Sequence, residues 1–419
     1  MRILKGKAAK AYVRTLESRG SRLEEVEPAV RKIVVDVRRN GDRALRKYAR
    51  KFDGLGPSEC LRISDSELRK AWKNASAPLR AALHVAERNI RQSCEWQKPK
   101  EWRRSRNGIS LRQLLRPLES VGCYVPGGRF PLVSTLLMTV IPAQVAGVKN
   151  IRVVSPRPSD EVLAAAGMLG VKEFYRVGGA QAIAALAYGT KSIPRVDKIV
   201  GPGNLYVTAA KKMISFDCAI DMLAGPTEVV IVSSKGEPAF IAADLVAQAE
   251  HDPETLAMFI TTAENLAPAV AKEVELGGRG RSPLRESTIA IEALKNRGAV
   301  LIANSKRQAF EWANRIAPEH ITIEKEDLNF VQNAGSIFVG DYSAQAAGDY
   351  ASGPNHVLPT GGAARFRGGL SVMDFVKLIT VQEVSAKGLR GIAPAIVQLA
   401  ETEGLRAHAD SIRVRCANA

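Results

Sequence analysis

Four short apolar runs decide the fold: VGCYVPGG at 121–128, NIRVV at 150–154, EFYRVGG at 173–179 and DKIVGPG at 197–203. Their spacing leaves room for helices around 132–146, 161–169, 180–188 and 205–213. This alternation of strand and helix predicts a parallel, doubly wound α/β sheet. Ligands bind such sheets outside the carboxyl ends of the strands, so the three loops that carry glycine pairs are the first candidates for a binding site.

A second series of strand-like runs predicts a second α/β domain. Its members are EVVIVSS at 228–234, AMFITT at 257–262, STIAI at 287–291 and AVLIAN at 299–304. Residues 23–96 are predicted to be helical, because apolar side chains recur there at three- and four-residue spacing. Residues 340–369 are crowded with Gly, Ala, Ser and Pro, which is typical of an ordered functional loop. For the last fifty residues we expect helices followed by a short strand, IRVR at 412–415.

Composition indicates a multidomain globular protein. The chain has 419 residues, of which 46% are hydrophobic and 25% charged. Its five cysteines are odd in number and widely spaced, which favours free thiols in a reducing cytoplasm. We expect neither a secretion signal nor a membrane span, because no apolar stretch approaches the roughly 20 residues that a span needs.

The formal charge of +17 leaves the choice of partner open. The densest basic stretch, KPKEWRRSR at 98–106, lies beside Trp96 and contains Trp102, so a nucleic-acid groove with stacking aromatics is one interpretation. A solvated charged surface is the favoured one, because no nucleic-acid-binding motif accompanies the stretch. We therefore expect neither nucleic acid nor a membrane as a partner.

The five histidines can be weighed one by one. His84 lies in a helical run with no polar cluster beside it and is interpreted as a structural or surface residue. In AFIAADLVAQAEHDP at 239–253, Gln248 and His251 stand three residues apart on one helix face and could point at one ion. Imidazole is a preferred zinc ligand, whereas an amide oxygen is a less usual one, so the spacing alone leaves a metal role open.

The other histidines each have a carboxylate near them in the sequence. Glu319 and His320 are adjacent in APEHI, and such a pair can remove a proton and activate water. Asp349 and His356 lie in the glycine-rich loop, within the motif GDYASGPNHVLP. Glu403 and His408 lie on a predicted helix near the chain end, within the motif EGLRAH. For Glu319 and His320, an ordinary surface pair is the competing interpretation.

The chain resembles the histidinol dehydrogenase family over nearly its whole length. The co-linear motifs that carry the resemblance are VGCYVPGG, VGGAQAIAALAYGT, IVGPGN, IDMLAGPTEV, DLVAQAEHDP, APEHI, GDYASGPNHVLPT, GGLSVMDF and EGLRAH. No G-x-G-x-x-G follows the first strand of the α/β region, so the ordinary dinucleotide fingerprint is missing. The loops VPGGR, VGGAQAI and GPGNLYV are the nearest substitutes, and each is weak by itself.

The resemblance implies a zinc- and NAD-dependent oxidation of L-histidinol to L-histidine through histidinaldehyde, the last two steps of histidine biosynthesis. It implies one zinc ion per subunit with four ligands: Gln248, His251, Asp349 and His408. It makes His320 the general base and Glu319 the group that activates water. These two residues and the four zinc ligands also border the substrate, together with Thr227, His356 and Glu403. Relatives commonly have Ser at the position of Thr227, so that contact is less certain. The implied NAD-contacting residues are Tyr124, Gln181 and Asn204.

The implied architecture is an intertwined homodimer of two incomplete Rossmann-like α/β domains with small helical extensions at both ends. We divide the chain into an N-terminal helical extension, a first α/β domain with the zinc and catalytic residues, a second NAD-binding domain and a C-terminal extension swapped between subunits. The boundaries are 1–22, 23–121 with 228–370, 122–227 and 371–419. His408 would then reach the site of the partner subunit.

Two other hypotheses stay open at this point. One is a related zinc and NAD enzyme that acts on another alcohol, such as a sulfonated diol, although Glu403 and His356 suit a basic amino alcohol better. The other is a binding protein that keeps the fold without the catalysis. Retention of Glu319, His320 and all four candidate ligands disfavours it.

Overall fold

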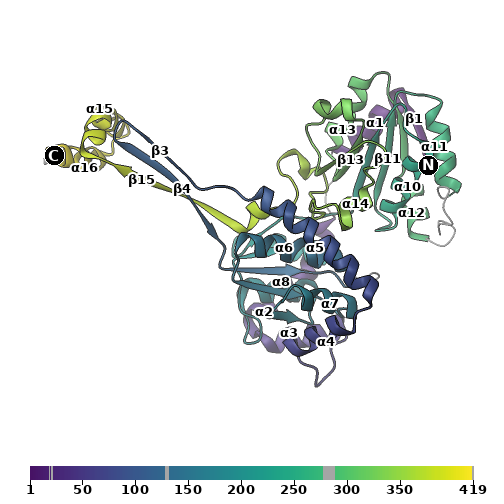
Figure 1. Ribbon diagram of the computed structural model, residues 1–419, viewed down its shortest axis with the longest axis horizontal. Helices are drawn as coiled ribbons and strands as arrows, with labels where there is room; N and C mark the ends of the chain where they lie inside the picture. The colour runs from purple at the N-terminus through teal and green to yellow at the C-terminus, as the bar shows by residue number, and fades with distance from the viewer. Residues whose placement is uncertain (18, 20–21, 128–131, 277–287, 418–419) are drawn as a thin grey trace.

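The computed structural model describes residues 1–17, 19, 22–127, 132–276 and 288–417. It consists of two α/β units, each built on a six-stranded sheet, and an arm that projects from them (Figure 1). Among the described residues, no helix is long and apolar enough to cross a membrane. The prediction of an α/β fold with parallel sheets is therefore confirmed.

The first sheet to consider contains the four runs that decide the fold. Its order is β2 (Arg62–Ile63), β7 (Glu173–Tyr175), β6 (Asn150–Val154), β5 (Ser120–Tyr124), β8 (Lys198–Val200) and β9 (Ala219–Ile220). All neighbours are parallel except β2, which pairs antiparallel with β7. The connecting helices are α6 (Val133–Ala146), α7 (Asp160–Met168), α8 (Gly179–Tyr188) and α9 (Leu205–Ile214). The predicted strands and helices of this region are confirmed.

The N-terminal helices cover this same sheet. They are α2 (Leu23–Asn40), α3 (Asp42–Asp53), α4 (Asp65–Asn74) and α5 (Ala77–Gln97). Val30 and Leu45 belong to the same apolar core as Val154 of β6. Leu68 and Ile90 belong to a second apolar core, which includes residues of β5. This packing differs from the predicted division, which joined residues 23–121 to 228–370. The periodicity shows which helix faces are apolar, but not which sheet those faces cover.

The second sheet is entirely parallel. Its order is β1 (Arg2–Lys5), β12 (Ala299–Ile302), β11 (Leu256–Thr261), β10 (Glu228–Val232), β13 (His320–Ile323) and β14 (Ser336–Val339). Its helices are α1 (Gly6–Glu17), α10 (Pro238–Ala249), α11 (Leu266–Leu276), α12 (Thr288–Asn296) and α13 (Lys306–Ile316). A short 3-10 helix, Lys325–Phe330, follows β13. The second α/β unit is confirmed.

Two expectations for this unit differ from the structure. Residues 1–22 are not only a helical extension, because β1 pairs with β12 and forms the edge of the sheet. The expected strand at 287–291 is wrong over its described residues, which begin α12. Ala290, Ala293 and Leu294 are buried at helical spacing, so the β-branched residues at the start of the run mislead.

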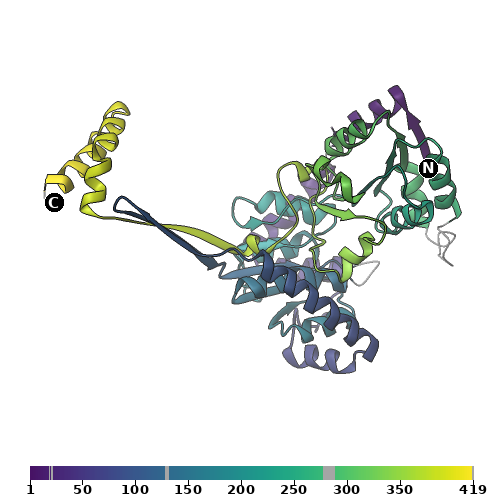
Figure 2. The same cartoon turned by 45° about the horizontal axis from the view of Figure 1, so that its top comes forward.

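The arm combines two distant parts of the sequence. β3 (Trp102–Arg106), β4 (Ile109–Pro117) and β15 (Val376–Val384) form an antiparallel sheet that carries α15 (Ala386–Thr402) and α16 (Arg406–Ala417) at its end (Figures 1 and 2). The expected IRVR strand is wrong, since residues 412–415 lie within α16. The nine-residue strand β15 was likewise not expected among the last fifty residues. Its partner β4 lies more than two hundred residues earlier, a pairing that local patterns do not reveal.

The predicted glycine-rich loop forms a seam between the two units. It contains α14 (Gln345–Tyr350) and the 3-10 helix Ala363–Arg365, and a further 3-10 helix, Val372–Phe375, follows it. The Asn89 side chain donates to Ala351 O at 2.8 Å, and Asn355 donates to Met138 O at 2.6 Å. These two bonds hold the loop against helices that cover the first sheet. Helix α14, in contrast, packs against α10 of the second unit.

Candidate active site

The acid–base pair Glu319 and His320 lies at the amino end of β13. Ala317, which caps the end of helix α13, has the left-handed conformation (φ 50°), and Pro318 then leads into the strand. Both side chains are buried, with 7% of Glu319 and 3% of His320 exposed. The turn therefore delivers two titratable groups into the interior rather than to the surface.

The backbone of Glu228, the first residue of β10, orients both groups. Its N–H donates to Glu319 Oε2 at 3.0 Å, and its carbonyl lies 3.2 Å from His320 Nδ1. The Thr227 hydroxyl donates to the same carboxylate oxygen. A carbonyl can only accept, so His320 carries its proton on Nδ1 and presents the lone pair of Nε2. That Nε2 is buried and has no hydrogen-bond partner.

Electrostatics tune this pair for proton transfer. Burial raises the pKa of Glu319 to about 7, against the opposing influence of His320 and Thr227. Burial lowers the pKa of His320, but the carboxylates of Glu319 and Asp349 more than offset this and leave the pKa raised. Groups whose pKa values lie near neutrality are the ones that exchange protons efficiently at physiological pH.

Three of the four predicted zinc ligands come together beside His320. Asp349 Oδ2 accepts from Gln248 Nε2 at 3.0 Å, and Asp349 Oδ1 lies 3.6 Å from His320 Nε2. His251 is exposed, and its Nδ1 lies 3.2 Å from the Gln248 carbonyl. Gln248 Oε1 is buried without a partner, an arrangement that leaves an oxygen donor available.

The fourth predicted ligand, His408, lies elsewhere. It is exposed on α16 at the far end of the arm, and Glu403 is exposed at the end of α15 beside it (Figure 1). In the described part of the chain, no three His, Cys, Asp or Glu side chains stand close enough to hold an ion. Because His408 of the same chain lies far away, Gln248, His251 and Asp349 supply at most three of the four predicted zinc ligands.

His356 bridges the two units. Its Nδ1 lies 2.8 Å from the Asp349 carbonyl, and its Nε2 lies 3.2 Å from the Thr135 hydroxyl at the start of α6. Burial lowers the pKa of His356, which keeps this imidazole neutral at pH 7. His356, predicted to contact the substrate, therefore lies in the seam beside Asp349.

The glycine loops of the first sheet converge at its carboxyl edge. Tyr124 ends β5, and its hydroxyl accepts from Gly179 N at 3.1 Å. Gln181 Nε2 and Gly178 N donate to the buried carboxylate of Asp53, at 3.0 and 3.1 Å. The two glycine amides at the start of α8 are thus already bonded to side chains of the chain itself.

Asn204 occupies the third loop, where its Oδ1 accepts from Tyr206 N and Val207 N and caps α9. The loop is anchored by Lys211 and Asp221, a buried ion pair with an Nζ–Oδ1 distance of 2.5 Å. Gly201 in the same loop has φ 109° and lies against the Tyr124 carbonyl, so no other residue fits there. Residues 128–131 of the first glycine loop lie outside the described residues.

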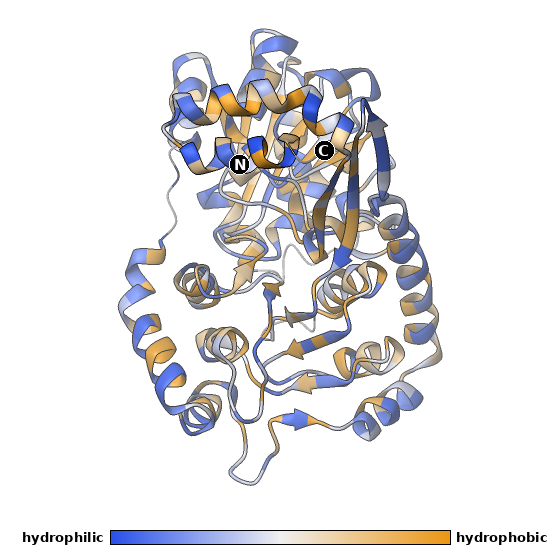
Figure 3. Cartoon of the chain, turned by 90° about the vertical axis from the view of Figure 1, so that its left-hand side faces the viewer, coloured by the Kyte–Doolittle hydropathy of each residue, from blue (hydrophilic) through white to orange (hydrophobic). Residues whose placement is uncertain are grey.

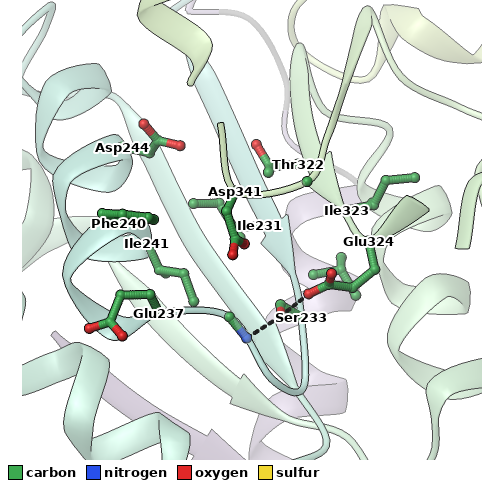
Figure 4. A pocket seen from close by; sticks show the side chains of 13 residues that line it. Ile231, Ser233, Glu237, Phe240, Ile241, Asp244, Thr322, Ile323, Glu324 and Asp341 are labelled. Atoms are coloured by element: carbon green, nitrogen blue, oxygen red, sulfur yellow. Dashed lines mark hydrogen bonds between the residues drawn. The ribbon is translucent and has the colours of Figure 1, made fainter. Parts of the chain in front are cut away.

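The two sheets contribute opposite edges to the site. The loops of the first sheet lie at the carboxyl ends of strands, as expected, whereas Thr227, Glu319 and His320 lie at the amino ends of β10 and β13. The carboxyl ends of β10 and β13 line a separate pocket with Glu237, Asp244, Glu324 and Asp341 (Figure 4). None of these four residues is a predicted site residue.

Sequence reasoning missed three residues that shape the site: Asp53, Glu228 and Arg19. Asp53 and Glu228 act through buried bonds to residues in other segments, and Arg19 pairs with Glu228. Asp53 and Arg19 lie in none of the quoted motifs, and Glu228 lies within IDMLAGPTEV without having been singled out. A buried charge beside an apolar run, as in EVVIV, is a signal that could have drawn attention to Glu228.

Comparison with known proteins first defines the fold. An acetylating aldehyde dehydrogenase from Geobacillus thermoglucosidasius has a similar arrangement, with a TM-score of 0.50, 12% identity and coverage of 90% of this chain and 95% of that one. At this identity the likeness concerns the fold alone. It places the chain among proteins of two α/β units, each built on a six-stranded sheet.

The family follows from closer relatives. The family model for histidinol dehydrogenase matches residues 16–416. Histidinol dehydrogenase from Methanosarcina mazei is 44% identical over 97% of this chain and 96% of its own length, and that from Bacillus thuringiensis subsp. konkukian is 46% identical over 94% and 93%. A crystal structure of histidinol dehydrogenase from Elizabethkingia anophelis has a TM-score of 0.94 and 36% identity, covering 100% of this chain and 98% of that one. The chain belongs to the histidinol dehydrogenase family.

The raised pKa of Glu319 predicts a stability cost that Glu319→Gln relieves. A carboxyl whose pKa rises from 4.5 unfolded to about 7 folded stabilises the fold below pH 4.5 and loses that contribution as the pH rises through 7. For metal-free protein we expect Glu319→Gln to be more stable than wild type at pH 8, by roughly 3 kcal/mol, with a much smaller difference at pH 5.

Urea unfolding of chelator-treated protein at the two pH values measures this difference. Glu264→Gln, which changes an exposed carboxylate, serves as the control and should show little difference at either pH. A Glu319→Gln protein that is less stable than wild type at pH 8 would contradict the assignment.

Proposed function

We propose that this protein oxidises L-histidinol to L-histidine through histidinaldehyde, with two NAD⁺ as hydride acceptors, as the last two steps of histidine biosynthesis. The observation that carries the proposal is the buried Glu319–His320 pair beside Asp349 and Gln248. The names of the full-length relatives agree with this substrate. Five free cysteines fit the cytoplasmic location that we expect for this reaction.

Zinc is the metal that fits the donors beside His320. Gln248, His251 and Asp349 supply an amide oxygen, an imidazole and a carboxylate, and we propose His408 of a second subunit as the fourth ligand. The partnerless Gln248 Oε1 supports this fit, because a buried acceptor normally has a donor or an ion. When bound, zinc would hold the amine and imidazole nitrogens of the substrate and polarise its oxygen.

His320 is the proposed base of the first oxidation. Its Nε2 faces Asp349 and has no other partner, so it is placed to take the proton of the substrate hydroxyl. As that proton moves to Nε2, the adjacent carbon loses hydride and the alcohol becomes an aldehyde; His320 later returns this proton to the aldehyde oxygen when water adds, which restores the base. NAD⁺ supplies the acceptor for the hydride.

Glu319 is the proposed base for water in the second oxidation. A carboxylate with a pKa of about 7 can take a proton from water as it attacks the aldehyde, which gives the hydrate. His320 then removes a hydroxyl proton from the hydrate while a second hydride leaves, and the carboxylic acid results. Burial around both residues keeps bulk water away from the reactive aldehyde.

Other residues are proposed to bind the two substrates. Thr227, His356 and Glu403 would contact histidinol, and Tyr124, Gln181 and Asn204 would contact NAD⁺. Thr227 donates its hydroxyl hydrogen to Glu319, so its contribution also includes holding that carboxylate. The added methyl group relative to Ser does not prevent this bond.

The arm supports the proposed homodimer. It exposes apolar side chains on its strands and helices, among them Leu378, Ile379, Leu399 at 64% and Val414 at 60% exposure. Figure 3, which faces the arm, shows hydrophobic positions recurring along its helices. Such a surface on an extended arm is typical of subunit contacts. A second chain whose arm covers the seam would bring His408 and Glu403 to the site.

The two half-reactions separate the roles of the acid–base pair. Glu319→Gln should lower the rate of NADH formation from added histidinaldehyde by about a hundredfold, with a smaller effect on the first oxidation of histidinol. His320→Asn should impair both steps. Glu326→Gln, which removes an exposed carboxylate of the same unit, should leave both unchanged. Equal losses in both steps for Glu319→Gln would contradict its assigned role.

Mixed dimers test the sharing of His408. His408→Ala and His251→Ala are each expected to be inactive, yet mixing them should restore about a quarter of wild-type activity, because half of the dimers then carry one complete site. His251→Ala mixed with Asp349→Asn should restore nothing. Both ligands come from the same chain of each site, so every site in the mixed dimer lacks one of them. No rescue in the first mixture, with subunit exchange verified by mass spectrometry, would exclude sharing.

A further inference from the structure

One buried ion pair close to the site has no part in the proposed chemistry. Arg19 contacts Glu228 through two bonds, Nε to Oε1 and Nη2 to Oε2, both 2.8 Å long. Only 12% of the Arg19 side chain and 5% of the Glu228 side chain are exposed. Burial of two charges costs free energy, so a pair in this position calls for an explanation beyond stability.

Glu228 is connected to both members of the acid–base pair through its backbone. Its N–H fixes Glu319, and its carbonyl fixes the Nδ1–H tautomer of His320. The conformation of this single residue thus sets the direction of one carboxylate and one imidazole. The Glu228 side chain is held by Arg19 and also accepts from Gly361 N at 3.1 Å.

Arg19 also reaches the other segment that leads into the site. Its Nη2 donates to the carbonyl of Ile316 at 2.9 Å, and Ile316 ends α13 three residues before Glu319. One guanidinium therefore connects the start of β10 with the turn that precedes β13. A fork of several fixed donors suits this task, whereas a point charge would not.

We propose that Arg19 and Glu228 are positioning residues for the two oxidations: the ion pair holds the Glu228 backbone, which orients Glu319 and the His320 tautomer. This inference rests on the proposed function for the roles of Glu319 and His320. Neither Arg19 nor Glu228 is assigned a contact with substrate, metal or NAD⁺. The N-terminal segment thereby becomes part of the catalytic apparatus rather than an appendage.

The kinetic test compares Arg19→Gln, Glu228→Gln and the double variant in the purified zinc-loaded dimer. Each single change should lower kcat for histidinol by about ten- to a hundredfold, since small displacements of reacting groups have effects of this size. KM for NAD⁺ should stay within about twofold of wild type, because the implied NAD⁺ loops belong to the other sheet. The double variant leaves no unpaired buried charge and should recover part of kcat.

Arg315→Gln is the matched control. Arg315 forms a comparable two-bond pair with Glu17 at 2.6 and 2.7 Å and ties the same N-terminal segment to α13, without contacting Glu228. It should leave kcat within about twofold of wild type if positioning through Glu228 is what matters. An equal loss of kcat in Arg315→Gln and Arg19→Gln would reduce the pair to a general anchor and overturn the proposal.

A spectroscopic test does not depend on turnover. With nitrogen-15 in the five histidines only, and His320→Asn for assignment, the wild-type His320 ring should show one Nδ1–H tautomer at a pH high enough to deprotonate the imidazolium. Arg19→Gln should give a mixture of tautomers, while Arg315→Gln should not. A wild-type Nε2–H tautomer, or an unchanged spectrum in folded Arg19→Gln, would overturn the inference. If the wild type does not oxidise histidinol but these spectra change as expected, the proposed function fails and the positioning role stands.

Discussion

The start of β10 is the constraint on which the site depends. A strand has one N–H and one carbonyl to offer at each residue, and at Glu228 both go to side chains of the neighbouring segment instead of remaining with water. Because His320 begins β13, and Val229 pairs with His320 in the parallel register, the same sheet that places the two residues side by side also orients them. Catalytic geometry here follows from strand pairing, and the buried carboxylate and imidazole owe their perturbed pKa values to that placement.

The second level of organisation is the meeting of two unlike sheet edges. The first sheet offers the carboxyl ends of its strands, where loops can bind a ligand, and the second offers amino ends, where Glu319 and His320 lie. The glycine-rich loop joins them, and His356 touches both units. Among the described residues, no three His, Cys, Asp or Glu side chains are grouped so that they could hold an ion, and His408 lies at the far end of the arm (Figure 1). An arm with exposed apolar side chains and two predicted site residues makes physical sense as a structure completed by a second copy.

Much of this was predictable from local patterns. The four runs from 121 to 203 and those at 228–234, 257–262 and 299–304 became strands, because short apolar runs bounded by glycine are a strong local signal. β13 was missed, since HITI is only four residues long and follows a proline. The helices of residues 23–97 were recognised, but their attachment to the first sheet was not, because burial depends on contacts that sequence spacing does not encode.

The motif residues Gln248, His251, Asp349 and His356 do lie near Glu319 and His320. The roles of Glu228, Asp53 and Arg19 depend on backbone bonds and buried pairs, which sequence patterns do not reveal even where, as for Glu228, the residue lies within a quoted motif.

The central claim is that one metal-dependent site carries out both oxidations. The most direct measurement is the number of NADH molecules formed per L-histidinol consumed by the purified protein, before and after removal of the metal with a chelator and after addition of zinc. The account predicts two NADH per histidinol, loss of the activity on chelation and its return with zinc. One NADH per histidinol with release of the aldehyde, or full activity in the metal-free protein, would contradict it.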